Sequence, residues 1–306
     1  MLVRLRAWIT NESRRINDRR LIPISGTLVS ARQRGNTRTV SRFAWAFLAY
    51  MLGVILWGAY VRASGSGAGC GNHWPLCNGE VIPTLPEKAM LIEFIHRVTS
   101  GLALISVLAL VYLTVRATVR RAWARTTAVL SAVLTLNEAF LGALLVLLQR
   151  VGNDQSATRA VLLSFHLANT LLLIGSIALT ALWLTDPPAR GELSVREAAR
   201  FVIGLLAAVL IEVGGALAAL GDTLFPAASL RSALASDFSA TSHFQLRLRL
   251  LHPAMAIVGA TYVIWLCATL VRTRAGIVHK LGIALILLAI GQVLLGALNV
   301  LMLAPV

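Results

Sequence analysis

The chain has 306 residues, of which 57% are hydrophobic and only 13% are charged, and its formal net charge at pH 7 is +15. This composition excludes a soluble globular domain and is typical of a protein that crosses a membrane several times. The positive charge does not indicate nucleic-acid binding, because much of it is concentrated ahead of the first apolar stretch.

The chain begins with a basic segment over residues 1–41. The first 42 residues contain ten arginines and only two acidic residues, Glu12 and Asp18. A basic segment before a first membrane span is typical of a cytoplasmic tail near lipid headgroups. A transit peptide is the alternative, which the two acidic residues disfavour.

Seven apolar stretches follow, each long enough to cross a bilayer at about 20 residues per helix. They cover residues 43–63, 91–115, 126–148, 160–184, 200–221, 249–271 and 280–303. Basic residues in the connections 116–125 and 272–280 place both connections and the N-terminus in the cytoplasm, although the fifth-to-sixth loop also carries arginines. The 64–90 loop is therefore expected on the outer side.

The 64–90 loop contains Cys70 and Cys77, separated by six residues. In a non-cytoplasmic loop this pair suggests a disulfide that fixes a lid. A metal site is the weaker alternative, because only His73 is nearby as a third ligand. Cys267 lies in an apolar stretch and is expected to be a buried thiol.

The chain contains an internal repeat. The segment Leu141-Gly142-Ala-Leu resembles Leu295-Gly296-Ala-Leu, and both His96 and His252 open a long apolar stretch that ends in Val-Arg. Gly58-Ala59 resembles Gly215-Ala216 in the same way. The spacing of the first half places a further histidine helix after residue 306, so we expect the second half to be one helix short.

Three histidines lie near the outer ends of apolar stretches, namely His96, His166 and His252. Ionisable side chains inside a membrane are costly, so such residues are functional candidates. Imidazoles at one depth on facing helices can hold a haem iron from both sides. We expect His96 and His166 to form one such pair and His252 to be half of a second. The alternative for each is an interfacial or hydrogen-bonded histidine.

Acidic residues accompany these histidines. Glu93 lies three residues before His96, where a carboxylate could relay protons or stabilise positive charge on a substrate. An ion pair with Arg97 or Arg62 is an equally good interpretation. Glu138 occupies the repeat position of Gln292, which favours a polar contact between helices.

Four arginines lie at the expected outer rim, and they are predicted partners of haem propionates. They are Arg62, Arg97, Arg247 and Arg249. Snorkelling of their side chains to the membrane interface is the alternative.

Taken together, these motifs resemble the bacterial heme A synthase family, in its cysteine-containing type. The resemblance extends over residues 43–304 and is carried by Gly58–Cys70, Trp74–Gly79, Glu93–Arg97, Phe165-His166, Gly221–Pro226, Arg249–Pro253 and Leu295–Val300. The resemblance implies an all-α polytopic membrane protein of two pseudo-symmetric four-helix bundles. The first bundle would cover residues 42–185, and the second, with three of its helices, residues 186–306.

The resemblance further implies oxidation of the C8 methyl group of heme O to the formyl group of heme A, by successive hydroxylations, for the biogenesis of cytochrome oxidases. His96 and His166 would hold the substrate haem, Glu93 would be the essential carboxylate, and Cys70 and Cys77 the disulfide. The second bundle would hold heme b through His252. Without an eighth helix, we expect that haem to be held weakly or with another sixth ligand.

The implied location is the bacterial cytoplasmic (inner) membrane, with heme O delivered by a heme O synthase. Homo-oligomers are compatible with this assignment, and nucleic acid is not an expected partner. Two other functions fit paired histidines: a dihaem b-type electron carrier, and a non-catalytic haem-binding assembly protein. Glu93 beside His96 and the disulfide lid favour the synthase.

Overall fold

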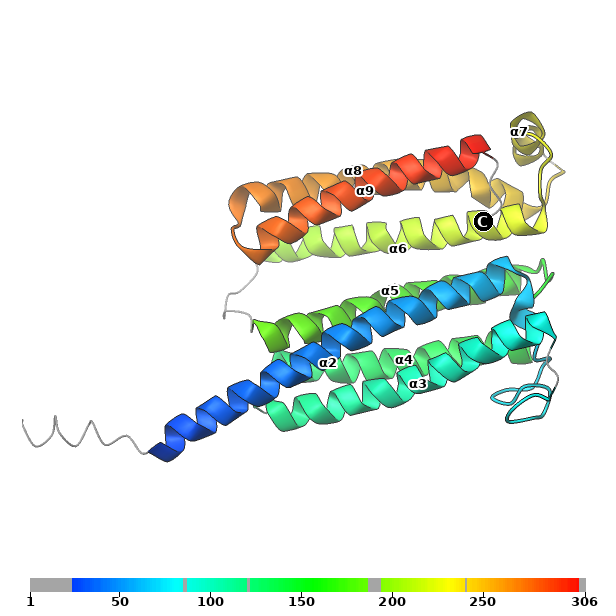
Figure 1. Cartoon of the computed structure of the whole chain (residues 1–306). Helices are drawn as coiled ribbons and strands as arrows, with labels where there is room; N and C mark the ends of the chain where they lie inside the picture. Colours follow the sequence, from blue (N-terminus) through cyan, green and yellow to red (C-terminus); the bar gives the residue numbers. More distant parts are fainter. Residues whose placement is uncertain (1–23, 85–86, 120–121, 187–193, 240, 303–306) are drawn as a thin grey trace, which may run out of the picture.

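The computed structural model describes residues 24–84, 87–119, 122–186, 194–239 and 241–302, and these residues are almost entirely helical (Figure 1). Their helices are α2 (Ile24–Ala63), α3 (Lys88–Ala117), α4 (Trp123–Leu147), α5 (Ala157–Thr185), α6 (Val195–Leu224), α7 (Leu230–Phe238), α8 (Phe244–Thr273) and α9 (Ile277–Met302). All of these except the short α7 are long and apolar enough to cross a membrane. The seven predicted spans are therefore confirmed, and the chain is a multi-pass membrane protein.

Helices α2, α3, α4 and α5 form a closed four-helix bundle in which α2 and α4 each contact both α3 and α5. Its centre contains fully buried apolar side chains such as Val107, Leu110 and Leu173. Hydroxyl groups join α4 to α5, because Ser131 Oγ lies 2.8 Å from Ser176 Oγ. Such small and polar contacts are typical of helix packing in lipid, where the hydrophobic effect does not draw helices together.

The second group of helices contains α6, α8 and α9, with α8 packed against both of the others. Helix α6 also lies along α5 of the first bundle, so the two groups stand side by side (Figure 1). Helix α9 is the most exposed span, with 6% of its apolar window buried against 44% for α5. The core of the described structure therefore lies in the first bundle.

Helix α2 begins at Ile24, well before the apolar stretch that was predicted to start near residue 43. Polar residues can continue a helix beyond the membrane, whereas an apolar window detects only the part in lipid. The inner part of α2 is fixed to α5, because Ser41 Oγ lies 2.6 Å from Thr185 Oγ1. Residues 24–41, predicted as part of the basic tail, are thus continuous with the first span, and residues 1–23 lie outside the described residues.

Side-chain caps start α5, α6, α7 and α8. The Ser194 hydroxyl accepts a hydrogen bond from the backbone N–H of Glu197, whose carboxylate accepts one from the N–H of Ser194. Ser156 caps α5 by accepting from the N–H of Arg159. Because such caps satisfy backbone groups at the membrane surface, they fix where α5 and α6 enter the bilayer.

Candidate functional site

The three candidate histidines lie at the same depth on helices that run in the same direction. His96 is eight residues after the start of α3, His166 nine after the start of α5, and His252 eight after the start of α8. At a rise of 1.5 Å per residue these positions are about 12–14 Å along each helix. Each histidine therefore lies a little more than two turns from the start of its helix, near the outer end.

Each histidine ring packs against a glycine of a neighbouring helix. A Cβ atom added to Gly58 would lie 2.9 Å from Cε1 of His96, and one added to Gly215 would lie 3.0 Å from Cε1 of His252. The contact of His166 is looser, because a Cβ on Gly142 would lie 3.8 Å from its Cε1. The rings of α3 and α8 therefore rest directly on the backbones of α2 and α6.

These glycine contacts support the internal repeat in three dimensions. Gly58 and Gly215 are the repeat-related glycines of the sequence, and they meet His96 and His252 with nearly identical distances to Nε2, 3.3 and 3.4 Å. The two helix pairs thus present a histidine in the same way.

The two ring nitrogens of these histidines differ in their surroundings. Nδ1 of His96, His166 and His252 is buried and has no hydrogen-bond partner among the residues that the structure describes. Nε2 has no such partner either, but it is not buried, so it is the nitrogen open to a ligand.

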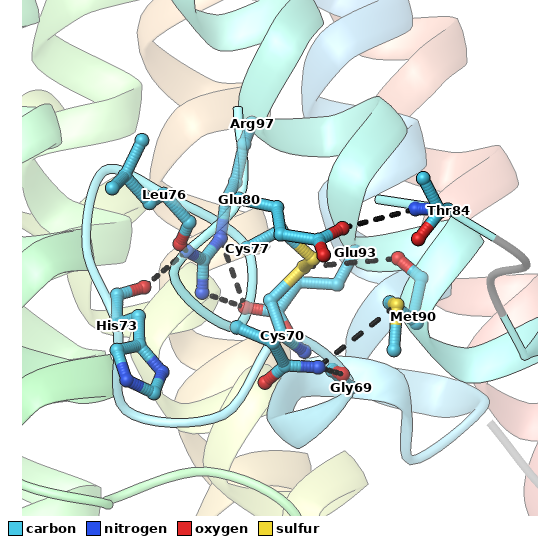
Figure 2. The surroundings of a disulfide bond; sticks show 11 residues. Gly69, Cys70, His73, Leu76, Cys77, Glu80, Thr84, Met90, Glu93 and Arg97 are labelled. Atoms are coloured by element: carbon cyan, nitrogen blue, oxygen red, sulfur yellow. Dashed lines mark hydrogen bonds and ion pairs between the residues drawn. A yellow bond between two sulfur atoms is a disulfide. The ribbon is translucent and has the colours of Figure 1, made fainter. Parts of the chain in front are cut away.

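Glu93 is held by the outer loop. Its side chain is buried, with the residue 3% exposed, and its Oε2 accepts a hydrogen bond of 2.8 Å from the N–H of Cys70. Its Oε1 accepts from Arg97, whose Nε lies 3.1 Å away (Figure 2). The ion pair with Arg97, one of the two interpretations of the sequence, is therefore present.

Arg97 connects this carboxylate to the lid. Besides Glu93, its guanidinium donates to the carbonyl oxygens of His73 and Leu76, both in the outer loop (Figure 2). Cys70 and Cys77 form the predicted disulfide, which closes that loop. Arg97 thus lies on α3 and holds both Glu93 and the lid. Its role as a partner of a haem propionate stays a prediction.

The lid contacts α3 through its backbone at Gly69. A Cβ atom at this position would lie 2.5 Å from the carbonyl carbon of Ala89, so only glycine allows the loop to approach this closely. This contact brings the N–H of Cys70 within reach of Glu93, one turn of α3 above His96. The lid, the carboxylate and the histidine therefore form one continuous assembly.

Glu138 makes the polar inter-helix contact that the repeat predicted. Its Oε2 accepts from Asn169 and its Oε1 from Thr170, both on α5. The sequence did not reveal that Oε1 also lies 3.4 Å from Nδ1 of His166. The signal was available in the spacing, because Glu138 is one turn before Gly142, against which His166 packs.

The remaining outer arginines have different partners. Arg62 of α2 donates to the carbonyl of Ala216 on α6 at 3.2 Å, which links the first bundle to the second helix group. Arg249 pairs with Asp222 and Asp237, and thereby ties α8 to α6 and α7. Arg247 is exposed on α8.

A buried arginine that the sequence does not reveal, Arg159, lies at the outer end of α5 and is 6% exposed. Its guanidinium donates to the carbonyls of Gly152 and Asp154, both at 2.7 Å, and so organises the loop before α5. No motif in the sequence distinguishes it from an interfacial arginine. Cys267 is a buried free thiol, as predicted.

Comparison with known proteins identifies the group to which these features belong. Residues 41–306 match the COX15-CtaA family model, described as cytochrome oxidase assembly protein. A heme A synthase of Bacillus licheniformis is 35% identical over 140 residues, which cover 46% of this chain and 43% of that protein. One from Exiguobacterium is 29% identical over 163 residues, covering 53% and 52% of the two chains.

A Thermus thermophilus protein named protoheme IX farnesyltransferase is 43% identical over 268 residues, which cover 86% of this chain. The matched region is 44% of that protein, so the chain spans less than half the length of this relative. With the family model matching nearly all of the membrane-spanning part, the chain belongs to the cytochrome oxidase assembly protein family that contains the heme A synthases.

Proposed function

We propose that the chain is a heme A synthase, which oxidises the C8 methyl group of heme O to a formyl group by two successive hydroxylations and loss of water, with the electrons passed to an external acceptor. One observation carries this proposal: His96 and His166 lie at one depth on α3 and α5, with buried Nδ1 and open Nε2 atoms. Because α3 and α5 are diagonal in the bundle, their imidazoles can grip a planar group from both sides.

The residues present fit a haem. Nδ1 is the buried nitrogen in each ring, which leaves Nε2 as the one directed to a ligand. A glycine lies against the Cε1–Nε2 edge of His96 and of His252, and its lack of a Cβ atom leaves room beside Nε2 for a ligand. The haem supplies the redox chemistry of its iron, and the protein supplies the position of the methyl group and the surrounding charge.

We propose that Glu93 stabilises positive charge on the substrate and keeps the lid over it. Conversion of a methyl to a formyl group removes four electrons, so positive charge must be stabilised while electrons leave. Glu93 is the buried carboxylate one turn above His96, and Arg97 and the N–H of Cys70 hold it in place. These bonds give the carboxylate a fixed position between the lid and His96.

The second helix group is proposed to hold heme b through His252. Its ring sits on Gly215 as His96 sits on Gly58, which supports the same type of ligation. Arg62 joins α2 to Ala216, the neighbour of Gly215, and so links the two helix groups that carry the histidine sites. This arrangement suits electron transfer between the substrate and the cofactor.

We further propose that the substrate is a farnesylated haem made by a farnesyltransferase that works beside this protein. The Thermus relative supports this, because its printed name describes farnesyl transfer to protoheme IX, and this chain resembles 44% of it. The proposed site is the bacterial inner membrane, with the N-terminus in the cytoplasm. The Cys70–Cys77 disulfide supports an extracytoplasmic position for the lid, because disulfides persist in oxidising compartments.

A dihaem electron carrier is the second candidate, favoured by the near-identical geometry of the Gly58–His96 and Gly215–His252 pairs. Such symmetry is expected when both sites perform the same task. Glu93 argues against it, because the residue at the corresponding place in α8 is Arg249, of opposite charge.

Co-expression with a heme O synthase in a host that makes no heme A separates these functions. Chromatography of the extracted pigments should show heme A with the natural chain and none with Glu93→Ala. Glu87→Ala is the matched control, because Glu87 is exposed at the start of α3 and its side chain makes no capping bond. Bound haem with no heme A under any condition would favour the electron carrier.

A further inference from the structure

Glu138 is surrounded by hydrogen-bond donors. The side-chain amide of Asn169 donates to its Oε2, and the hydroxyl of Thr170 donates to its Oε1. Asn169 is itself fixed, since it donates to the carbonyl of Leu134 at 2.9 Å and accepts from Asn137 at 2.8 Å. The carboxylate therefore has one fixed position between α4 and α5.

That position faces His166. Oε1 of Glu138 lies 3.4 Å from Nδ1 of His166, and this nitrogen has no hydrogen bond to any other described residue. When Nε2 binds a metal, Nδ1 carries the proton and needs an acceptor. Glu138 is the acceptor within reach, and a small rotation of the ring completes the bond.

The other candidate ligands lack such a partner. Nδ1 of His96 is unpartnered among the described residues, and the nearby Glu93 already uses both of its oxygens on Cys70 and Arg97. Nδ1 of His252 is likewise unpartnered. On the repeat, the position of Glu138 corresponds to Gln292 of α9, which is exposed and carries no charge.

We propose that Glu138 is a positioning residue that makes His166 the more strongly bound of the two axial ligands of the first haem. This inference rests on the proposed function, in which His166 binds the substrate iron. A carboxylate acceptor orients a ligand imidazole and increases its electron donation to the metal. His96, without an acceptor, is then the weaker ligand, and the two faces of the haem are not equivalent.

The test uses the full chain carrying His252→Ala, loaded with haem by co-expression, so that the signal comes from the first site. We compare it with the same chain carrying Glu138→Gln by redox titration and low-temperature EPR. Loss of the acceptor should disfavour the ferric form by about tenfold, which raises the midpoint potential by ~59 mV for a one-electron couple. Thr170→Val removes the competing donor to Oε1 and should leave the potential unchanged or lower it.

Glu212→Gln is the matched control. Glu212 is a second intramembrane carboxylate, on α6, and its Oε2 is buried without a hydrogen-bond partner among the described residues. Removing it changes the charge nearby without touching a histidine. Equal shifts in Glu138→Gln and Glu212→Gln, or no shift in either, would overturn the inference about Glu138.

The ligand assignment in the proposed function can be tested separately from the role of Glu138. If the first-site haem keeps its amount and spectrum after His166→Ala, then His166 is not a ligand, and the proposal about Glu138 falls together with the ligand assignment. If His166→Ala abolishes the low-spin signal while Glu138→Gln leaves the potential unchanged, only the role of Glu138 is contradicted. These two results are distinguished in the same set of samples.

Discussion

Replacement of Gly58 by alanine should damage haem binding without damaging the fold. The new methyl group would lie 2.9 Å from Cε1 of His96, whereas two carbon atoms pack best at about 3.5–4.0 Å. The ring must therefore move by roughly 0.6 Å. A histidine side chain can make this movement cheaply when it has no ligand, but an imidazole that binds iron has a fixed position.

The expected cost follows from this overlap. Overpacking in a well-packed site costs about 1–3 kcal/mol, and about 1.4 kcal/mol corresponds to a tenfold change in affinity. We therefore expect Gly58→Ala to weaken haem binding to the first site between about fivefold and 150-fold. The helix itself should not be destabilised, because alanine favours a helix over glycine by about 1 kcal/mol.

Two glycines provide matched controls. Gly53 lies on the same helix with nothing within 4 Å of an added Cβ, and Gly142 would place its Cβ at an ordinary 3.8 Å from His166. Haem titration of the purified His252→Ala chain, followed by absorbance, gives the affinity of each variant, and thermal unfolding gives its stability. An affinity of Gly58→Ala equal to that of Gly53→Ala would refute the assignment of His96 as a ligand that rests on the α2 backbone.

Further outcomes are expected in the lid and at the junction of the helix groups. Cys70→Ser opens a short covalent loop and should lower the free energy of unfolding of the lid by about 2–3 kcal/mol, measured by the rate of proteolysis within the loop. Arg97→Ala leaves the buried Glu93 without its cation and should lower the free energy of unfolding by about 3–5 kcal/mol, measured by thermal unfolding. Adding Glu93→Gln to this variant should recover part of the lost stability, because it removes the unpaired buried charge. Arg62→Met removes the bond to Ala216 and should lower thermal stability by about 1–3 kcal/mol, and an unchanged unfolding temperature would contradict a structural role for that bond.

Much of the fold follows from the sequence because lipid imposes simple rules. The seven spans could be predicted from apolar length, and the depth of His96, His166 and His252 from their distance to the helix starts. The disulfide could be predicted from two cysteines in one outer loop. These predictions depend on local properties of the chain, such as hydropathy and spacing.

Other features depend on contacts between distant segments and could not be predicted. Helix α7 is short and polar enough to resemble a loop, and it is fixed by the pairing of Asp237 with Arg249. The direction of the Glu93 carboxylate is set by the backbone of Cys70, which approaches only because Gly69 lies directly on α3. The sequence shows that Glu93 lies near His96, but the attachment of Glu93 to the lid could not be predicted from it.

The proposed ligation of a haem by His96 and His166 is tested most directly by EPR of the haem-loaded His252→Ala chain. We predict a six-coordinate, low-spin ferric haem with two histidine ligands, which becomes high-spin or is lost in both His96→Ala and His166→Ala. A low-spin haem that persists when both histidines are replaced would contradict the account, because no pair of imidazoles on facing helices would then hold it.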